Sequence, residues 1–333
     1  MTNKLPLNDS VFFAWTRVSR RSEQLAKYFE LTYVRYNRWG QSDISLTCSL
    51  IFNFAKTLFW VVFHRPKFIF TFQAHPFISI SAKLGTWFTG KGVVIPDLHT
   101  AAYTNHFTGI QGALGKWIMG KCPLILVHND ESKTFLGNAI DELKDKLFVL
   151  EDALPEFPSF NSELDSNELK CVLISRFAPD EPIQEFLDAV SKIDNCLFYI
   201  TGNHQKATFD ISKYPEDRIF FTGFLSDNDY LKLLQSSDTI LILTTREMTL
   251  LSGGYEALSL EKPIVLSDTE TLRNYFGNTA IYTQNNANDI RQAVIKMMPE
   301  IHNRRKAILD LKKQKIDEWQ ETASNLIQLI NQL

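Results

Sequence analysis

The sequence has little of what marks several large classes of protein. Its four cysteines are far apart and form no C-x-x-C pair, so we expect reduced thiols of the cytosolic kind and no disulfide framework. The net charge of −3 shows no excess of basic residues of the kind that binds nucleic acid. The residues after Met1 are polar and lack the long apolar run of a signal peptide, so secretion is not expected.

Two common phosphate-binding loops are also missing. The sequence contains no G-x-x-x-x-G-K-[ST] motif and no G-x-G-x-x-G after its first predicted strand, residues 11–15. The usual NTPase and dehydrogenase sites are therefore not predicted. No H-E-x-x-H motif occurs, and no D-x-D pair directly follows a predicted strand, so we expect no metal site of these kinds.

Short apolar runs alternate with helical patterns along the whole chain. At 333 residues the chain exceeds the size at which one hydrophobic core keeps growing, which favours two domains. Continuous apolar strands that alternate with helices indicate parallel sheets covered on both faces. The predicted strands lie at 11–15, 67–72, 92–95, 123–127, 170–175, 196–201, 219–221, 239–243, 263–266 and 279–282.

A proline- and acid-rich stretch, 151–158, separates the two series of strands and is typical of a linker. We therefore predict two doubly wound α/β domains, 1–152 and 153–314, with a final helix, 315–333, that packs back on the first. In such folds ligands bind at the carboxyl ends of the strands, so the predicted site is a cleft between the domains.

Residues 46–63 form a long apolar stretch that is interrupted chiefly by Asn53 and Lys56. Its length lies at the lower end of what crosses a bilayer, and a central lysine is costly in lipid. We predict a buried or interfacial helix and favour burial in the core. Together with Trp117-Ile118-Met119, the stretch also raises the hypothesis that one face of the protein contacts a membrane surface.

The strongest local signal follows the predicted strand 239–243. Ser252-Gly253-Gly254 at the start of a helix offers unobstructed N–H groups and a positive dipole end, which suit a diphosphate. Glu256 in the next turn can accept ribose hydroxyls. The alternative is that the glycines only form a tight turn and that Glu256 only complements the helix dipole.

This order of elements resembles the donor-binding half of family-4-type GT-B glycosyltransferases, also called group 1. Glu256-Ala257-Leu258 and Glu261-Lys262-Pro263-Ile264-Val265 match the later part of the family pattern. The earlier part departs from it, because eight residues separate Glu247 from Glu256 where the family has seven, and Met248-Thr249-Leu250 replaces Gly-Phe-Gly. The resemblance implies two Rossmann-like domains, a nucleoside-diphosphate sugar as donor, with UDP or GDP favoured, and no required cofactor.

Further donor contacts are implied by the same resemblance. Arg176 follows the strand 170–175 and would clamp the diphosphate; its alternative role is a surface salt bridge. Asp180-Glu181-Pro182 stands where a second basic residue is expected. Gly223-Phe224-Leu225 would hold the base, or would simply end a strand before a helix cap. The remaining implied contacts are Gly202, Thr249, Ser252, Gly253, Gly254, Tyr255 and Glu256.

In the first half the resemblance implies an acceptor side. Asp97 and His99 directly follow the strand 92–95 and resemble the family's Asp-x-His loop, where Asp97 could be a general base in an inverting reaction. The alternative is that both cap the next segment. Arg17 and Arg20 are candidate anion contacts, whereas we interpret Arg21 as solvated. His75 and His128 have no partner visible in the sequence and are interpreted as structural.

The predicted function is transfer of a hexose from a nucleotide sugar to a glycan or lipid-linked acceptor in bacterial surface polysaccharide synthesis (capsule, exopolysaccharide or O-antigen). Retention is the default implied by the family, with Glu247, Asp97 and His99 as catalytic candidates. The alternatives are an inverting enzyme, a GT-B-shaped sugar-nucleotide epimerase and a non-catalytic two-lobed binding protein. The expected location is the cytoplasm, or the inner face of the cytoplasmic membrane.

Overall fold

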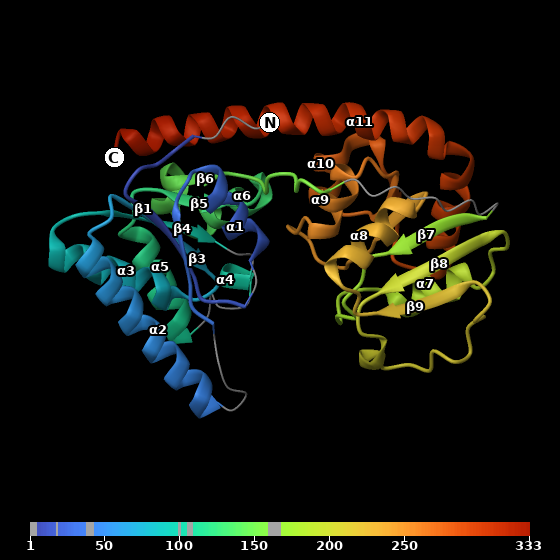
Figure 1. Cartoon of the computed structure of the whole chain (residues 1–333), viewed down its shortest axis with the longest axis horizontal. Coiled ribbons are helices and arrows are strands. Elements are labelled where there is room, and N and C mark those ends of the chain that lie inside the picture. Colours follow the sequence, from blue (N-terminus) through green and yellow to red (C-terminus); the bar gives the residue numbers. More distant parts are fainter. Residues whose placement is uncertain (1–4, 18, 38–42, 99–100, 105–108, 159–167) are drawn as a thin grey trace. The chain divides into compact units, whose positions relative to one another are not determined.

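The computed structural model of the chain describes residues 5–17, 19–37, 43–98, 101–104, 109–158 and 168–333 (Figure 1). The chain divides into two compact units. Met1–Ala153 together with Asp317–Leu333 forms the N-terminal unit, and Leu154–Ile316 forms the C-terminal unit. His99 lies outside the described residues, so its predicted role has no structural counterpart here.

The N-terminal unit is built on a six-stranded sheet in the order β2-β1-β3-β4-β5-β6, in which all neighbouring strands are parallel. The strands are β1 (Ser10–Ala14), β2 (Thr32–Arg35), β3 (Phe68–Gln73), β4 (Val93–Leu98), β5 (Ile125–Val127) and β6 (Leu147–Val149). The sequence did not predict β2. This strand lies at the sheet edge and keeps much of its surface exposed, so it lacks the continuous apolar pattern of a central strand.

Helices cover both faces of this sheet. They are α1 (Arg20–Tyr28), α2 (Asp43–His64), α3 (Pro76–Thr89), α4 (Ala101–Thr104), α5 (Gly109–Gly120) and α6 (Asp130–Ala139), followed by the 3-10 helix η1 (Asp141–Lys146). Successive strand residues alternate between the faces. Phe12 and Phe70 pack with α1, whereas Val11, Phe13 and Ile69 pack on the side of α2, α3 and α5.

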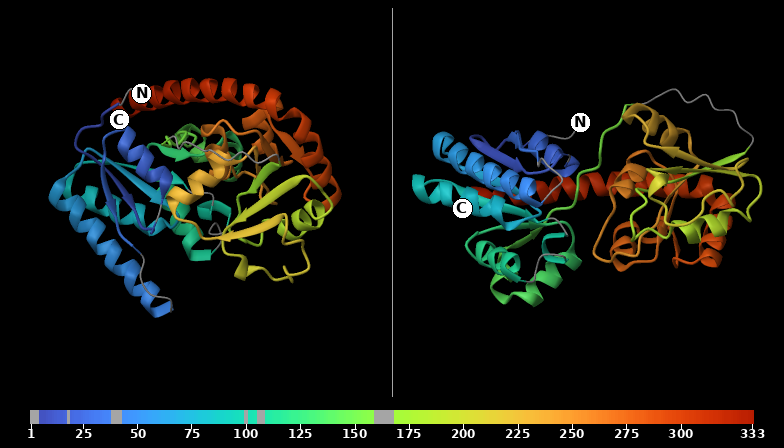
Figure 2. Two further views of the ribbon diagram at one scale, coloured as in Figure 1. Left: turned by 45° about the vertical axis from the view of Figure 1, so that its right-hand side comes forward. Right: turned by 90° about the horizontal axis from the view of Figure 1, so that it is seen from below.

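The C-terminal unit holds a second parallel sheet, in the order β12-β11-β10-β7-β8-β9 (Figure 2). Its strands are β7 (Leu169–Leu173), β8 (Cys196–Thr201), β9 (Ile219–Gly223), β10 (Thr239–Ile242), β11 (Ile264–Ser267) and β12 (Ile281–Thr283). Consecutive strands run outward from β7 to β9 and then restart on the other side of β7 with β10. The order therefore reverses between β7 and β10, as in a doubly wound nucleotide-binding sheet.

The helices of this unit are α7 (Ile183–Val190), α8 (Asp227–Ser236), α9 (Ser252–Ser259), α10 (Glu270–Phe276) and the first part of α11 (Ala287–Asn331), with the 3-10 helices η2 (His204–Lys206) and η3 (Gly277–Thr279). Two apolar cores lie on opposite faces of the sheet. Two parallel sheets, each covered on both sides, confirm the predicted pair of doubly wound α/β domains.

The helix α11 is a single element of 45 residues. Ile290 and Met297 near its beginning belong to a core of the C-terminal unit. Trp319 and Leu326 near its end are buried in a core of the N-terminal unit, where Trp319 Nε1 donates to the carbonyl oxygen of Glu151 at 2.9 Å. The last seventeen residues, 317–333, are therefore part of the first unit although they follow the second in sequence.

Burial of residues 46–63 in the core, which the sequence analysis favours, is wrong. Of the candidate membrane-crossing window in α2, only 22% is buried. The inward side of the helix is lined by Ser49, Asn53, Thr57 and Val61, which are small or polar. The prediction fails because four large apolar residues of the stretch, Ile51, Phe52, Phe59 and Phe63, are exposed.

Candidate functional site

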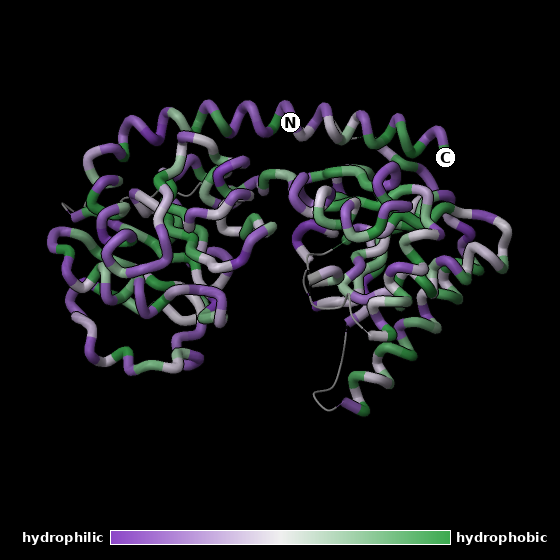
Figure 3. The backbone as a smooth tube through the Cα atoms, turned by 180° about the vertical axis from the view of Figure 1, so that it is seen from behind, coloured by the Kyte–Doolittle hydropathy of each residue, from purple (hydrophilic) through white to green (hydrophobic). Residues whose placement is uncertain are grey.

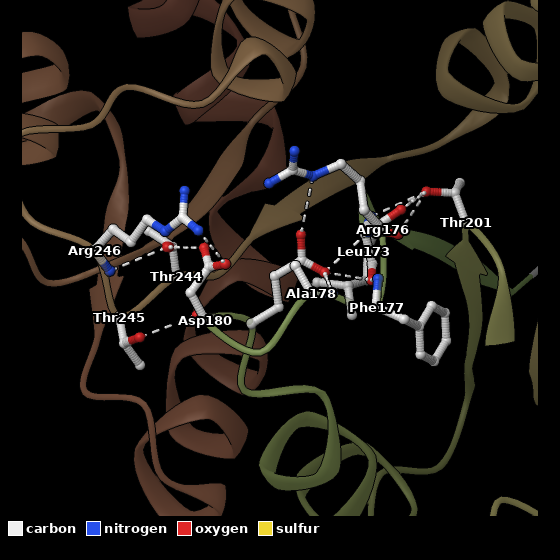
Figure 4. A network of polar contacts seen from close by, with 11 residues as sticks. Leu173, Arg176, Phe177, Ala178, Asp180, Thr201, Thr244, Thr245 and Arg246 are labelled. Atoms are coloured by element: carbon white, nitrogen blue, oxygen red, sulfur yellow. Dashed lines mark hydrogen bonds and ion pairs between the residues drawn. The ribbon is translucent and has the colours of Figure 1, made fainter. Parts of the chain in front are cut away.

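The loops that follow β7 and β10 lie at the point where the strand order of the C-terminal sheet reverses. Doubly wound sheets bind ligands at such a point, at the carboxyl ends of the strands. Both Arg176 and the stretch 244–251 are in these loops. Figure 4 shows the polar contacts that join them.

The β7 loop is organised around the carboxylate of Glu181. Its Oε2 accepts hydrogen bonds from Ser175 Oγ (2.8 Å), the Arg176 amide (2.9 Å) and the Ala178 amide (3.2 Å). Phe177 between them takes a left-handed backbone, φ 55°. Glu181 stands where the family has a second basic residue. Its carboxylate points into the loop and holds the turn in place.

Arg176 is held outward by this turn. Its side chain is 67% exposed, and its Nε lies 3.7 Å from Glu181 Oε1. The geometry is compatible with both predicted roles, because so loose a pairing leaves most of the guanidinium donors open to a ligand.

Asp180 ties the β7 loop to the β10 loop. Its carbonyl oxygen accepts from the Thr245 amide at 2.8 Å, and its Oδ2 accepts from Thr244 Oγ1 at 3.1 Å. Its Oδ1 pairs with Arg246 Nη2 at 3.1 Å. Because Asp180 is buried, these contacts fix the separation of the two loops.

Arg246 is a site residue that the sequence analysis missed. It follows β10 by only a few residues and is largely exposed, so it supplies a second cation beside Arg176. Figure 4 shows the guanidinium group of Arg246 beside Asp180. The sequence did contain a signal for Arg246, because a basic residue follows a buried strand within a few positions. The family pattern, however, places the second basic residue in the β7 loop.

The helix α9 begins at Ser252. Its N-cap residue, Leu251, provides no side-chain hydrogen bond, so the positive end of the helix keeps its capacity for an anion. Gly253 and Gly254 are buried, and a Cβ on Gly253 would lie 3.1 Å from Ile174 Cδ1 and 3.1 Å from Ile242 Cδ1. The glycines therefore let α9 approach the strands closely, while Ser252 remains exposed.

Glu256 is buried in α9 and accepts a hydrogen bond from Tyr230 Oη at 2.5 Å. Tyr230 belongs to α8, which follows the segment Gly223-Phe224-Leu225 at the end of β9. Phe224 is 82% exposed, so its ring is free to stack. Glu256 is thus linked, through one side chain, to the segment predicted to hold the base.

Gly202 ends β8 with φ 93°. A Cβ at this position would overlap the carbonyl oxygen of Ser175 in the β7 loop, so only glycine fits. The Gly202 amide donates to the carbonyl oxygen of Gly223 at 3.2 Å. Gly202 and Gly223 therefore set how closely the ends of β8 and β9 approach the candidate site.

Tyr255 is placed differently from its prediction. It is buried in a hydrophobic core and its ring makes an edge contact with Tyr275, at 5.5 Å between centroids. Tyr255 is therefore a packing residue, not an exposed donor contact. The sequence could not show that Tyr255 and Glu256 have different roles. Which neighbours each of these adjacent helical residues contacts depends on how the helix packs in the fold.

Glu247 is exposed in the β10 loop, and its carbonyl oxygen accepts from Thr249 Oγ1 at 3.1 Å. Met248 between them has φ 54°, in the left-handed region that favours glycine. The loop thus keeps a glycine-like turn although Met248-Thr249-Leu250 replaces the family's Gly-Phe-Gly.

Asp97 in the N-terminal unit is fully buried, with 0% of its side chain exposed. Arg21 donates to it through Nε, at 3.0 Å to each oxygen, and through Nη2 at 2.8 Å; Arg21 Nη1 reaches Asp152 at 2.6 Å. Against the effect of burial, the charges of Asp97 and Asp152 raise the pKa of Arg21. The structure therefore contradicts Asp97 as an accessible general base, and the prediction of a solvated Arg21 is wrong.

The other basic candidates of this unit are Arg17 and Arg20, which are exposed. His128 Nε2 lies 3.9 Å from Asp97 Oδ1, so this histidine has an acidic neighbour that the sequence did not reveal. Within the described ranges no group of three or more His, Cys, Asp or Glu side chains could hold a metal ion.

Residues 156–313 match the family described as Glycosyl transferases group 1. The chain also resembles HepE of Anabaena in complex with UDP (TM-score 0.73, 11% identity, covering 98% of this chain and 100% of that chain). A HepE structure with UDP-glucose gives a TM-score of 0.71 at 12% identity, with 96% and 99% covered. Sucrose-phosphate synthase from Thermosynechococcus elongatus gives 0.72 at 12% identity, with 98% and 99% covered. Comparison with curated proteins finds no match.

The structural likeness extends over both units and identifies the GT-B fold. The family match covers the C-terminal unit, which holds the arginines and the uncapped helix described above. The chain therefore has the GT-B fold, and its C-terminal unit resembles the group 1 glycosyltransferases over residues 156–313.

Proposed function

We propose that the protein transfers a sugar from a UDP-sugar to a glycan or lipid-linked acceptor, in the synthesis of a bacterial surface polysaccharide. The donor side rests on Arg176, Arg246 and the uncapped start of α9, which all follow β7 or β10 where the strand order reverses. Two guanidinium groups and a helix N-terminus suit a diphosphate. UDP is favoured because HepE structures contain UDP and UDP-glucose.

The remaining donor contacts follow from the geometry of the C-terminal unit. We assign the exposed ring of Phe224 and the backbone of Gly223 to the base. Glu256, oriented by Tyr230, is assigned to the ribose hydroxyls. A buried carboxylate that accepts a hydrogen bond from a neighbouring side chain keeps a fixed orientation, which suits the recognition of particular hydroxyl groups.

Catalysis in this proposal depends on stabilising the leaving diphosphate. In this proposal the charge that develops on the diphosphate is stabilised by Arg176, Arg246 and the α9 dipole. Retention of configuration, with Glu247 beside the transferred sugar, remains the proposed stereochemistry. The inverting alternative loses one of its two bases, because Asp97 is buried and bound to Arg21; His99 stays a candidate.

The direct test is isothermal titration of the protein with UDP, GDP and ADP and their sugars. Arg246→Ala should weaken UDP binding about tenfold or more, because it removes a charge-assisted hydrogen-bond donor. Arg218→Ala is the matched control, since Arg218 is an ion-paired arginine of the same sheet that lies before β9, at the amino end of that strand.

No binding of any nucleotide would reject the proposed donor site, and equal losses in both variants would reject the role of Arg246. Product analysis with a UDP-sugar separates the two enzyme classes. A transferase releases UDP only with an acceptor or slowly with water, whereas an epimerase converts the sugar while it stays attached to UDP.

A further inference from the structure

The helix α2 exposes several of its large apolar residues. Its buried positions, Ser49, Asn53, Thr57 and Val61, recur every four residues and so form one stripe along the helix. The opposite side is exposed and apolar, with Ile51 66% and Phe63 78% exposed. This arrangement is the reverse of an ordinary amphipathic helix on a soluble domain, which turns its apolar stripe inward. Figure 3 shows the hydrophobic colour along α2.

Exposed apolar residues also occur on α3, which packs on α2, and on α5, which packs on α3 (Figure 1). Both α3 and α5 end in exposed aromatic side chains. We define the apolar face as the large apolar residues that these helices expose: Ile44, Ile51, Phe52, Phe59, Phe63, Trp87, Phe88, Ile110 and Trp117. Single exposed apolar residues are ordinary, but a cluster on adjacent helices indicates a contact surface.

The charges of the segment that carries the apolar face are mostly positive. Residues 43–121, which contain α2, α3 and α5, include seven lysines and arginines, two aspartates and no glutamate, in a chain whose net charge is −3. One of the two aspartates, Asp97, is buried against Arg21. The exposed cations are Lys56, Arg65, Lys67, Lys91, Lys116 and Lys121. An exposed apolar surface on a segment with an excess of cations complements an anionic bilayer, where apolar side chains enter the interface and lysines meet lipid phosphates.

The packing of α2 determines how it meets a membrane. By length and composition this helix could cross a bilayer, but one of its sides is bound to protein. Thr57 Oγ1 accepts from Trp15 Nε1 at 3.0 Å, and Trp60 makes an edge contact with Phe13 at 5.3 Å between centroids. A Cβ on Gly85 of α3 would lie 2.7 Å from Val61, so the two helices are in close contact. A helix docked on a sheet in this way lies in the membrane plane and does not span it.

We propose that the apolar face is a docking surface for an anionic phospholipid bilayer, with α2 in the plane of the interface. Lys56, whose Nζ lies 4.4 Å from the ring centroid of Phe52, extends its ammonium toward the lipid phosphates while its methylenes stay with the apolar residues. This inference depends on the N-terminal unit alone and does not require the proposed UDP-sugar site. It places the acceptor side of the enzyme next to lipid.

The test is co-flotation of the full chain with vesicles of phosphatidylcholine, with and without phosphatidylglycerol. We expect the protein to float with the anionic vesicles and to bind neutral ones more weakly, and we expect added salt to reduce binding. The variant Ile51→Ser/Phe59→Ser/Phe63→Ser should lose at least about tenfold in vesicle binding. These side chains are exposed, so the fold and UDP titration of the variant should match the wild type.

Ile295→Ser is the matched control, because Ile295 is an exposed apolar residue of the C-terminal unit; its vesicle binding should equal that of the wild type. The proposal is overturned if the wild type stays with the soluble fraction in the presence of anionic vesicles, or if the triple variant floats as well as the wild type. It is also overturned if the wild type is a dimer that ignores vesicles and the triple variant is a monomer, since a second copy would then cover the apolar face.

Discussion

At the scale of single residues, the buried pair of Arg21 and Asp97 distinguishes a structural from a catalytic carboxylate. Two arginine nitrogens reach Asp97, and a third reaches Asp152. A buried ion pair costs desolvation when it forms, but removing one partner leaves the other charge inside the protein without compensation. Removal of either partner is therefore expected to lower the stability of the N-terminal unit.

We predict that Asp97→Asn lowers the free energy of unfolding by about 3 kcal/mol, since Arg21 keeps only Asp152 as an anionic partner. Urea denaturation measures the change, and Asp141→Asn in the exposed pair with Lys144 should have no detectable effect. If Asp97 were a general base, Asp97→Asn would abolish turnover with the stability unchanged, which is the opposite result.

At the scale of elements, Lys262 of the family's Lys-Pro segment joins two helices of the C-terminal unit. It follows α9, and its Nζ donates to the carbonyl oxygens of Gln235 (2.6 Å) and Ser237 (2.7 Å) at the end of α8. A cation there satisfies carbonyls that have no partner within the helix. Burial, together with the charge of Arg305, lowers the pKa of Lys262 to about 8.

This lowered pKa predicts how stability depends on pH. An unfolded lysine titrates near ~10.4, so between about pH 8 and that value the unfolded chain holds a proton that folded Lys262 has released. The contribution of Lys262 to stability therefore rises with pH in this window. We expect the difference in unfolding free energy between the wild type and Lys262→Met to grow by on the order of 1 kcal/mol from pH 8 to about 10.

Denaturation curves at several pH values measure this difference. Lys232→Met is the control, because Lys232 is an exposed lysine on α8 and its substitution should give a difference that is constant with pH. A constant difference for Lys262→Met as well would show that its ammonium stays protonated in the fold, held by the two carbonyls.

At the scale of the whole molecule, α11 contributes to the cores of both units. Trp319, Ala323, Leu326 and Ile330 are buried in the N-terminal unit, and the Trp319 ring makes an edge contact with Tyr28 at 4.5 Å between centroids. The first unit is therefore completed by residues that come after the second unit in the sequence. Its folding depends on sequence that follows the entire second unit.

Removal of residues 317–333 should accordingly destabilise the N-terminal unit by about 5 kcal/mol or more, because three large side chains leave its core. Hydrogen exchange should show that this unit no longer unfolds cooperatively. Titration should show that the C-terminal unit still binds UDP. Removal of only Gln332 and Leu333, which are exposed, is the control. A truncated chain with two intact units would contradict the assignment of Trp319 to the core.

Much of the architecture was predictable because buried parallel strands are apolar throughout. The runs at β3, β8 and β10 have this composition, and flanking polar loops mark their ends. The edge strand β2 was missed because it is partly exposed. The orientation of α2 was missed because hydrophobic composition does not state which side of a helix meets solvent, and here the small polar residues face inward.

The sequence alone was sufficient to predict two doubly wound domains and to point to the Gly253-Gly254-Tyr255-Glu256 segment, because strand composition and helix-start motifs are local properties. Only the tertiary structure could separate Glu256, which is held by Tyr230, from Tyr255, which is packed in the core. It alone brought Arg246 to Asp180 and placed Asp97 against Arg21. Those pairings join residues distant in the chain, and burial and charge compensation are decided only where such residues meet.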